Sequence, residues 1–316
     1  MNIIKYSKPA KTWREALPLG NGKTGLMIYG SLSKEKICFN DGTLYPKDYN
    51  SSESLNNLDE VRKLIFEGKN TEADALCEEK LTGFYSEAFM PLGEVNLEFR
   101  GIDKSKYTRS LNLSKAVHMV ETMGAKAECF SSYCDNISAY KITSAKPFSA
   151  VVKAKSKLKY NVKTENKSLF LLGNAPDYAA PNYLHTELYP IRYNEKKGMA
   201  FCLQVSVETN GKIGECKSKI KVENATELTL YFVTATGFNG FDKMPETNRN
   251  TVKQKCTAKM NSVEKNYDLL KSRHIADFSA LYSRQSISFH CDKDMNADEL
   301  LSAVKNGNDE TALTEL

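Results

Sequence analysis

The sequence contains no run of about 18 consecutive apolar residues, the length that a membrane-spanning helix needs. Its opening residues, 1–11, include no apolar core of the kind found in signal peptides. We therefore expect no membrane as a partner and a cytoplasmic location. The charge balance is also modest. A net charge of +5, from 44 basic and 39 acidic residues, gives no reason to expect nucleic acid as a partner.

The eight cysteines follow neither a metal-binding nor a disulfide pattern. There is no C-x-x-C pair, and the close pair Cys129 and Cys134 has no histidine nearby to complete a zinc site. Scattered cysteines in a chain of 316 residues without a signal peptide are typically reduced. We expect no metal, no cofactor, and free thiols at Cys38, Cys77, Cys129, Cys134, Cys202, Cys216, Cys256 and Cys291.

Residues 22–24, Gly-Lys-Thr, look like the end of a phosphate-binding loop, but the rest of that motif is missing. The motif requires glycine at position 17, where this chain has Leu17, and Pro18 removes one backbone donor from the cradle. A helix should follow the motif, whereas residues 26–29, Leu-Met-Ile-Tyr, are typical of a buried strand. These departures exclude a nucleotide site here.

What the chain does contain is a long series of strand patterns. Its 41% hydrophobic and 26% charged residues are typical of a globular protein rather than a disordered one. From Val95 to about Thr236, apolar residues alternate with polar ones in segments separated by turn residues. Many consecutive strands without intervening helices predict a mainly β fold, a large antiparallel β-sandwich.

Apolar residues at helical spacing occur in two other regions of the chain. Two short helices are expected as an insertion at about 56–81, and further helices are expected after Thr236. We therefore expect a β-sandwich domain over 1–245, a helical linker over 246–290, and the start of a further helical region over 291–316.

Four lysines alternate along one expected strand, at Lys153, Lys155, Lys157 and Lys159. Side chains two residues apart lie on the same face of a strand, so these lysines form a stripe. The stripe is either an anion-binding surface or a solvated outer face that discourages pairing with other strands. We favour the solvated face.

The most informative stretch is residues 13–45, in which Gly20, Gly22, Gly25 and Gly30 mark turns. A glycine-rich loop leads into a β-hairpin that ends at Asn40 and Asp41. The stretch contains W-x-E-A-L-P-L-G-N-G-x-x-G and then N-D-x-T-L-Y. Further blocks follow in order at 90–94 (MPLGE), 107–113 (YTRSLNL), 130–135 (FSSYCD), 173–183 (GNAPDYAAPNY), 234–242 (TATGFNGFD) and 274–284 (HIADFSALYSR).

In this order the blocks resemble the N-terminal β-sandwich domain of glycoside hydrolase family 95, the α-L-fucosidases. The resemblance implies a sandwich, a helical linker, an (α/α)6 catalytic barrel and a C-terminal β domain. It also implies hydrolysis of α-L-fucosyl linkages with inversion, by a glutamic acid and by asparagines that an aspartate assists, all of them in the barrel. None of those residues can be placed on this chain. We therefore expect no catalytic residues here, no activity of the chain alone, and two partners, the missing barrel and a fucosylated oligosaccharide or glycan.

Residues that could contact a sugar lie in two loops. Related sandwich-and-barrel hydrolases lend a loop of the N-terminal domain to the active site, and by that analogy we expect Asn40, Asp41, Thr43 and Tyr45 to do so. The second loop is rich in tyrosine and contains Tyr183 and His185. Its aromatic side chains could stack on a pyranose ring or could simply pack.

Each candidate has a structural alternative. Asp41, Asp177 and Asp242 lie beside glycine, proline or asparagine, where Asx-turns commonly use aspartate. His274 is better explained by a buried hydrogen bond that anchors a helix than by catalysis.

Departures from the family pattern leave the sugar open. Tyr45 replaces the usual tryptophan, Asp41 the usual glutamate and Asn174 a common arginine, so L-galactose or another relative of L-fucose remains an alternative to L-fucose. A stand-alone carbohydrate-binding module is the second hypothesis. It predicts an aromatic platform on a concave sandwich face, although Trp13 is the only tryptophan.

Overall fold

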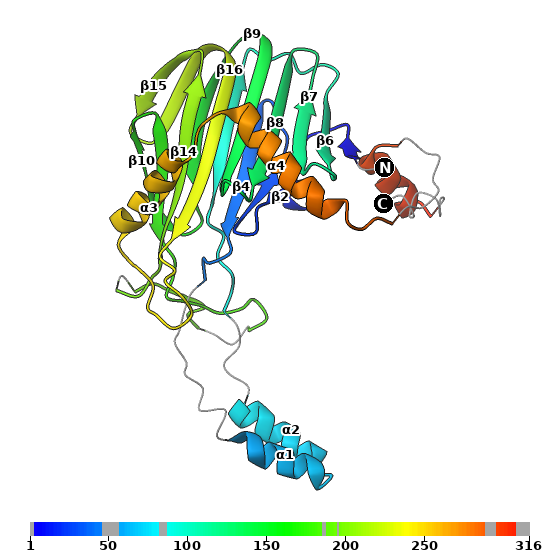
Figure 1. Cartoon of the computed structure of the whole chain (residues 1–316), viewed down its shortest axis with the longest axis vertical. Helices are drawn as coiled ribbons and strands as arrows, with labels where there is room; N and C mark the ends of the chain where they lie inside the picture. Colours follow the sequence, from blue (N-terminus) through cyan, green and yellow to red (C-terminus); the bar gives the residue numbers. More distant parts are fainter. Residues whose placement is uncertain are drawn as a thin grey trace.

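The computed structural model describes residues 3–45, 57–81, 87–184, 188–194, 196–287 and 295–307. Strands dominate these residues and pair antiparallel, which confirms the mainly β prediction. Figure 1 shows a curled sheet with helices on one outer face and a helical pair set apart below it. Among the described residues, no helix has both the length and the apolar character needed to cross a membrane.

Nine strands form the path of the larger layer, in the order β1-β6-β7-β8-β9-β16-β14-β11-β10. Their bounds are β1 Ile3–Tyr6, β6 Thr108–Asn112, β7 Val117–Glu121, β8 Ala125–Ser132, β9 Ile137–Lys155, β16 Lys219–Thr236, β14 Ala200–Thr209, β11 Ser168–Asn174 and β10 Lys159–Glu165. The second layer is the run β2-β3-β4-β5, which joins β9, together with β15, which joins β16. Its bounds are β2 Leu17–Gly20, β3 Thr24–Ile28, β4 Lys34–Asp41, β5 Gly93–Arg100 and β15 Lys212–Cys216.

The two long strands β9 and β16 belong to both layers. Residues 137–144 of β9 pair with β8, whereas residues 149–155 pair with β5. Where β16 crosses between layers its register with β9 shifts on both sides of Ala225, and Asn224 has a positive φ of 55°. Such bulges bend a strand and increase its twist. The sheet therefore folds over itself into a sandwich. Its two layers are joined by hydrogen bonds along the shared strands β9 and β16.

Apolar side chains fill the space between the layers and continue beneath the helices. Phe39 of β4 contacts Phe232 of β16 across the inner core, with ring centroids 5.0 Å apart. A second cluster lies on the outer face of the larger layer, where Phe130 packs on Tyr267 with centroids 5.4 Å apart. That face is covered by α3 (Arg249–Ser262) and α4 (Tyr267–Tyr282). Two apolar cores thus hold the sandwich and the helices together.

The remaining helices lie away from that face. Helices α1 (Leu58–Phe66) and α2 (Asn70–Leu76), followed by a π turn at Cys77–Leu81, project from one end of the sandwich (Figure 1). Helix α5 (Ala297–Lys305) has a capping box at Asn296 and contacts the N-terminal strand, where the Ser7 hydroxyl donates to Asp298. The described cysteines are free thiols, as predicted, and Cys291 lies outside the described residues.

Candidate functional site

Loops from distant parts of the sequence meet at the lower end of the sandwich in Figure 1. The amide of Met90 donates to Leu44 O (3.3 Å), and the amide of Ala88 donates to Ala179 O (2.9 Å). The hydroxyls of Thr43 and Thr236 are 2.6 Å apart. We call this surface the loop end and define it as residues 40–45, 87–92, 174–184, 188–193 and 236–248. It unites both loops that the sequence indicates as candidates.

Asp41 lies beneath this surface, not on it. Its side chain is fully buried, and Oδ1 accepts from the Thr43 amide (3.1 Å) and hydroxyl (2.7 Å). Oδ2 accepts from the Thr234 hydroxyl at 2.7 Å, and Lys23 Nζ lies 3.9 Å away. These are the bonds of an Asx-turn extended by an ion pair. The carboxylate therefore fixes residues 41–45 and offers no exposed oxygen to a solute.

The hydroxyls around Asp41 form a directed chain. Thr43 and Thr234 each donate their single hydroxyl hydrogen to the carboxylate. In each hydroxyl–hydroxyl contact that they make, the other threonine must therefore be the donor. Thr24 thus donates to Thr234 (2.7 Å), and Thr236 donates to Thr43 (2.6 Å). The chain links β3, β4 and β16, and it places the 41–45 turn against the end of β16.

The other predicted residues differ in their accessibility. Tyr45 is 40% exposed and packs on Phe89, with ring centroids 5.3 Å apart, while Tyr183 is 61% exposed. Asn40 is half-buried and Thr43 is committed to Asp41. His185 lies outside the described residues. The loop end exposes apolar side chains at Tyr45, Phe89, Tyr183, Leu188, Tyr189, Ile191, Phe238, Phe241 and Met244.

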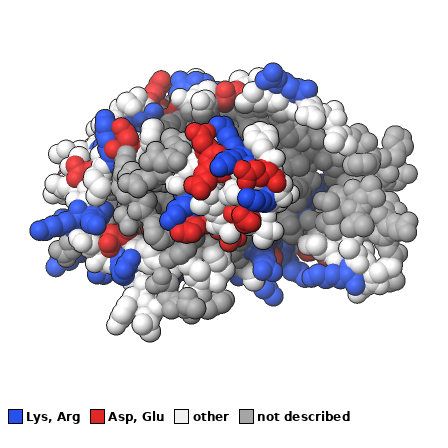
Figure 2. Space-filling model, turned by 90° about the horizontal axis from the view of Figure 1, so that it is seen from below, with Lys and Arg blue, Asp and Glu red and all other residues white. Residues whose placement is uncertain are grey.

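The projecting helices α1 and α2 carry a dense cluster of charged side chains. Figure 2, seen from below, shows acidic and basic side chains gathered at the centre, where α1 and α2 point towards the viewer. Several of them pair within the helices, such as Arg62 with Asp59 (3.4 Å) and Lys63 with Glu67 (3.9 Å). Exposed aromatic and aliphatic side chains thus characterise the described loop end itself.

Asp177 and Asp242 occupy turns at the same end. The Asp177 amide donates to Arg192 O at 3.0 Å, which extends the small ladder of β12 (Tyr178–Ala179) and β13 (Ile191–Arg192). Asp177 Oδ1 is buried and has no hydrogen-bond partner among the described residues. The Arg192 guanidinium lies 4.0 Å from the centre of the Tyr178 ring. Asp242 is exposed. Among the described residues, no hydrogen bond joins either carboxylate to a second one that could share acid–base work.

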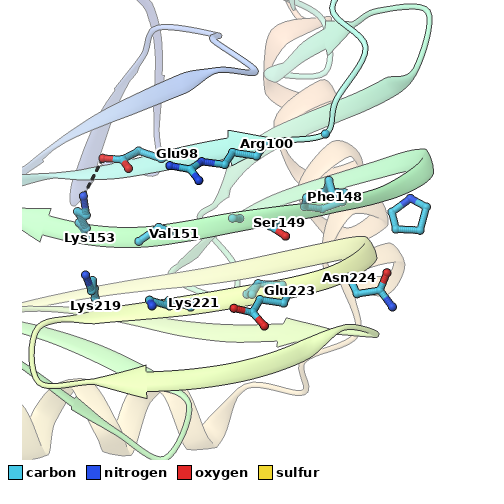
Figure 3. Close-up of a pocket in the computed structure, with 14 residues that line it drawn as sticks. Glu98, Arg100, Phe148, Ser149, Val151, Lys153, Lys219, Lys221, Glu223 and Asn224 are labelled. Carbon is cyan, nitrogen blue, oxygen red and sulfur yellow. Dashed lines mark hydrogen bonds and ion pairs between the residues drawn. The ribbon is translucent and has the colours of Figure 1, made fainter.

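Away from the loop end, a groove lies on the outer face of the second layer (Figure 3). This groove of about 760 Å³ runs over β5, β9 and β16, and Lys153 Nζ pairs with Glu98 Oε1 at 2.7 Å across it. Beside it, Lys155 pairs with Glu94 at 3.0 Å, so this part of the lysine stripe is a solvated, charge-paired face. The single aromatic residue in the lining is Phe148, which is 2% exposed. The groove therefore provides no stacking platform for a sugar.

His274 anchors α4 to the sheet. Its Nε2 lies 2.9 Å from Lys115 O and 3.1 Å from Ala116 O, and its ring stacks on Phe130 with centroids 5.2 Å apart. Burial lowers the pKa of His274, so the neutral imidazole is favoured and Nε2 is its donor. The geometry is that of a helix anchor, with no substrate-accessible atom to act on.

A buried polar cluster escaped the sequence analysis. Glu35, which the sequence analysis did not single out, is 1% exposed, and its Oε1 accepts from the amides of Gly30 (2.8 Å) and Lys36 (2.9 Å). Burial raises the pKa of Glu35 to about 8. The missed signal was register: Glu35, Ile37, Phe39 and Asp41 share one face of β4, and that face is buried.

No metal cluster accompanies these residues. The parts of the chain that the structure describes contain no group of three or more His, Cys, Asp or Glu placed to hold a metal ion. The loop end thus combines an accessible apolar surface with a buried carboxylate scaffold. Such a surface can bind a ring or a protein, but it presents no acid–base pair.

Comparisons with known proteins agree with this domain type. The model of "Glycosyl hydrolase family 65, N-terminal domain" matches residues 4–240. "Alpha-L-fucosidase 2" of Arabidopsis thaliana is 30% identical over 305 residues, which cover 90% of this chain and 36% of that protein. "Probable alpha-fucosidase A" of Aspergillus oryzae is 26% identical, over 96% of this chain and 43% of its own. The chain thus spans well under half the length of these curated relatives.

A solved structure described as a putative kojibiose phosphorylase from the human microbiome is also similar. It has a TM-score of 0.41 and 9% identity, and the match covers 89% of this chain and 35% of that one. The matching family model is numbered 65, whereas the sequence blocks resemble family 95. What the two have in common is the N-terminal domain of a glycoside hydrolase.

Proposed function

This chain belongs to the family of glycosyl hydrolase family 65 N-terminal domains, and from that premise we propose that it is the non-catalytic N-terminal domain of an α-L-fucosidase-like hydrolase. The full enzyme would remove terminal α-L-fucosyl or related α-L-galactosyl groups from an oligosaccharide or glycan, with inversion. No residue of this chain is assigned to the chemical step, which we attribute to an (α/α)6 barrel of the family 95 type.

The observation that carries this proposal is the similarity to a protein named as an α-L-fucosidase. The match is 30% identical and covers 90% of this chain, so it extends beyond the family model into the helical segments. The match also leaves 64% of that relative uncovered, which is ample for a separate catalytic region.

We further propose that the loop end meets the catalytic region and forms part of the rim of its active site. Exposed apolar patches of this kind mark interaction surfaces in soluble proteins. Within that surface the exposed rings of Tyr45 and Tyr183 would stack on a sugar, and Asn40 would hydrogen-bond to it. His185, proposed from the sequence alone, would add a further contact. Thr43 and Asp41 have a different role, because their polar groups are used internally. They are positioning residues that hold Tyr45 in place.

Activity measurements on mixed polypeptides test this proposal. We would measure hydrolysis of an aryl α-L-fucoside and of 2′-fucosylated lactose by this chain alone. The assay would then be repeated with the region of the Arabidopsis relative that this chain does not match. We expect no turnover by the chain alone and higher turnover by the mixture than by the added region alone. Turnover by the chain alone would contradict the non-catalytic assignment. A mixture no more active than the added region alone would contradict the proposal that the loop end forms part of the active-site rim.

A matched pair of variants locates the contact. Tyr45→Ala removes an exposed ring at the loop end, and Tyr160→Ala removes a ring of similar exposure (41%) on β10. We expect Tyr45→Ala to raise KM of the mixture by about tenfold, the usual scale for losing one stacking contact of about 1.4 kcal/mol. Tyr160→Ala should leave KM unchanged. Equal effects of both would argue against a substrate contact at Tyr45.

A further inference from the structure

A polar cavity of about 560 Å³ lies at the margin of the loop end, where β10 and β11 meet the start of α3. It is separate from the 40–45 turn and does not depend on the proposed function. The lining side chains that carry the argument are Lys159, Lys163, Arg249, Asn161, Asn174 and Asn194. Nearly all of them can donate hydrogen bonds, so the chemistry of this cavity differs from that of the apolar loop end.

Arg249 is held in a fixed orientation by two amide side chains. Its Nε donates to Asn174 Oδ1 at 2.5 Å, and its Nη1 donates to Asn161 Oδ1 at 3.3 Å. Guanidinium has five N–H donors, so these bonds leave three for another acceptor. Both partners are neutral. The positive charge of Arg249 is therefore oriented by the protein without being neutralised by it.

The support behind Arg249 is rigid. Asn174 uses both of its own amide hydrogens, donating to Gly198 O and to Thr247 O at 2.9 Å each. It thereby ties the end of β11 to two loops while its oxygen accepts from Arg249. A binding group that is locked by supporting hydrogen bonds loses little conformational entropy when a ligand arrives.

Two lysines add to the charge. Lys159 and Lys163 lie on the same face of the edge strand β10, and Lys159 Nζ also lies 4.5 Å from the centre of the Tyr193 ring. Neither lysine has a carboxylate within ion-pair distance among the described residues. Two carboxylates lie nearby but outside the lining. Glu165, two residues from Lys163 and within reach of its charge, forms its ion pair with Lys253, and Glu246 Oε1 accepts from the Asn248 amide at 2.7 Å.

We propose that this cavity binds a compact oxyanion, either free in solution or carried as the carboxylate or sulfate group of an acidic sugar. A planar guanidinium with free donors matches a carboxylate or sulfate bidentately, and such charge-assisted bonds are the strong ones. The described lining contains three cations and no carboxylate, which is the electrostatic requirement for such a ligand. The surrounding asparagine amides suit the hydroxyls of a sugar.

Calorimetric titration of the whole chain tests the proposal. The probes are inorganic sulfate, inorganic phosphate and glucuronate, with glucose as the neutral comparison and sodium chloride to match ionic strength. We expect saturable binding of at least one oxyanion and none of glucose. Tighter binding of glucuronate than of sulfate and phosphate would identify the acidic sugar, and the reverse would identify a free anion. Absence of saturable binding of all three would overturn the proposal.

One nearly isosteric variant assigns any binding to this cavity. Asn161→Asp puts a carboxylate beside Arg249 Nη1 and neutralises it from within, so we expect affinity to fall by at least about tenfold, equivalent to one lost charged hydrogen bond. The control is Asn112→Asp, which adds the same charge on β6, far across the sheet. Asn112 Oδ1 accepts from Ser114 and Lys115, and aspartate retains both bonds. Unchanged affinity in Asn161→Asp, or an equal loss in both variants, would refute the site.

Discussion

Two carboxylates on the same face of β4 show how differently one strand can bury a charge. Asp41 and Glu35 are 0% and 1% exposed, and both point into the sandwich. Both oxygens of Asp41 accept hydrogen bonds from threonines, and Lys23 lies nearby. Glu35 uses one oxygen, while Oε2 has no hydrogen-bond partner among the described residues. Partners, not burial alone, decide which charge the fold can hold.

The surroundings of Glu35 share this shortage of partners. His118 and Cys129 are opposite each other on β7 and β8, and Cys129 is opposite Tyr140 on β9. Both ring nitrogens of His118 and the hydroxyl of Tyr140 are buried without partners in the described part of the chain. Burial, with a smaller effect of the Arg109 charge, lowers the pKa of His118 to about 3. We therefore expect the Glu35 region to determine how stability depends on pH. The Asp41 region should determine the conformation of the 41–45 turn at the loop end.

The largest expected effect is the pH dependence caused by Glu35. Its pKa is about 8 in the fold against an ordinary value of 4.5, so the unfolded chain releases its proton first as the pH rises. Stability is then complete below pH 4.5 and falls between pH 4.5 and 8, by about 5 kcal/mol in all at about 1.4 kcal/mol per pKa unit. Glu35→Gln cannot ionise. Urea unfolding at several pH values should show that the free energy of unfolding of the variant rises relative to that of the natural protein between pH 4.5 and 8.

The control for this prediction is Glu208→Gln. Glu208 is a partly exposed carboxylate whose pKa burial also raises, so its replacement tests whether any such carboxylate gives the effect. We expect a much smaller change with pH than for Glu35→Gln. A parallel pH profile for Glu35→Gln and the natural protein would contradict the assignment.

The second effect concerns the loop end. Asp41→Ala leaves Lys23 without its counter-ion and the hydroxyls of Thr43 and Thr234 without their acceptor, so we expect a loss of about 3 kcal/mol. Asp41→Asn keeps one acceptor oxygen and should lose less. Urea unfolding gives the stability, and protection of the Thr43 amide in hydrogen exchange reports the turn. A stable Asp41→Ala variant with a protected Thr43 amide would contradict this prediction, because it would show that the turn forms without the carboxylate.

The strand pattern made the sandwich predictable, because apolar residues alternate along β5, while β14 and the second half of β16 are runs buried on both faces. The sequence analysis also predicted that Asp41 and Tyr45 lie at a sugar site, and that role stays a prediction. Pairing could not be read from local patterns. β9 changes partner from β8 to β5 within one strand, and that choice depends on contacts remote in sequence. Arg249 was missed for the same reason, since its partners Asn161 and Asn174 are far along the chain.

The third effect has the opposite sign of pH dependence. His118 is neutral in the fold, and its pKa of about 3 lies below the ordinary value of 6.5, so the unfolded chain takes up a proton first as the pH falls. Stability from this group is present above pH 6.5 and is lost towards pH 3, by about 2 to 3 kcal/mol at pH 4.5. His118→Asn should remove this acid slope. Between pH 4.5 and 6.5 the contributions of His118 and Glu35 oppose each other, so each single variant should expose the slope of the other group.

The smallest effect separates the two regions most cleanly, because it compares the removal of one hydroxyl from each. Tyr140→Phe deletes a buried hydroxyl that has no described partner, so we expect stability to be unchanged or to rise by less than about 1 kcal/mol. Thr234→Val deletes a hydroxyl that donates to Asp41 and accepts from Thr24, and should cost about 1 to 3 kcal/mol. Urea unfolding at pH 7 measures both. Equal losses would mean that Tyr140 is hydrogen-bonded in solution, and the contrast between a satisfied and an unsatisfied cluster would then fail.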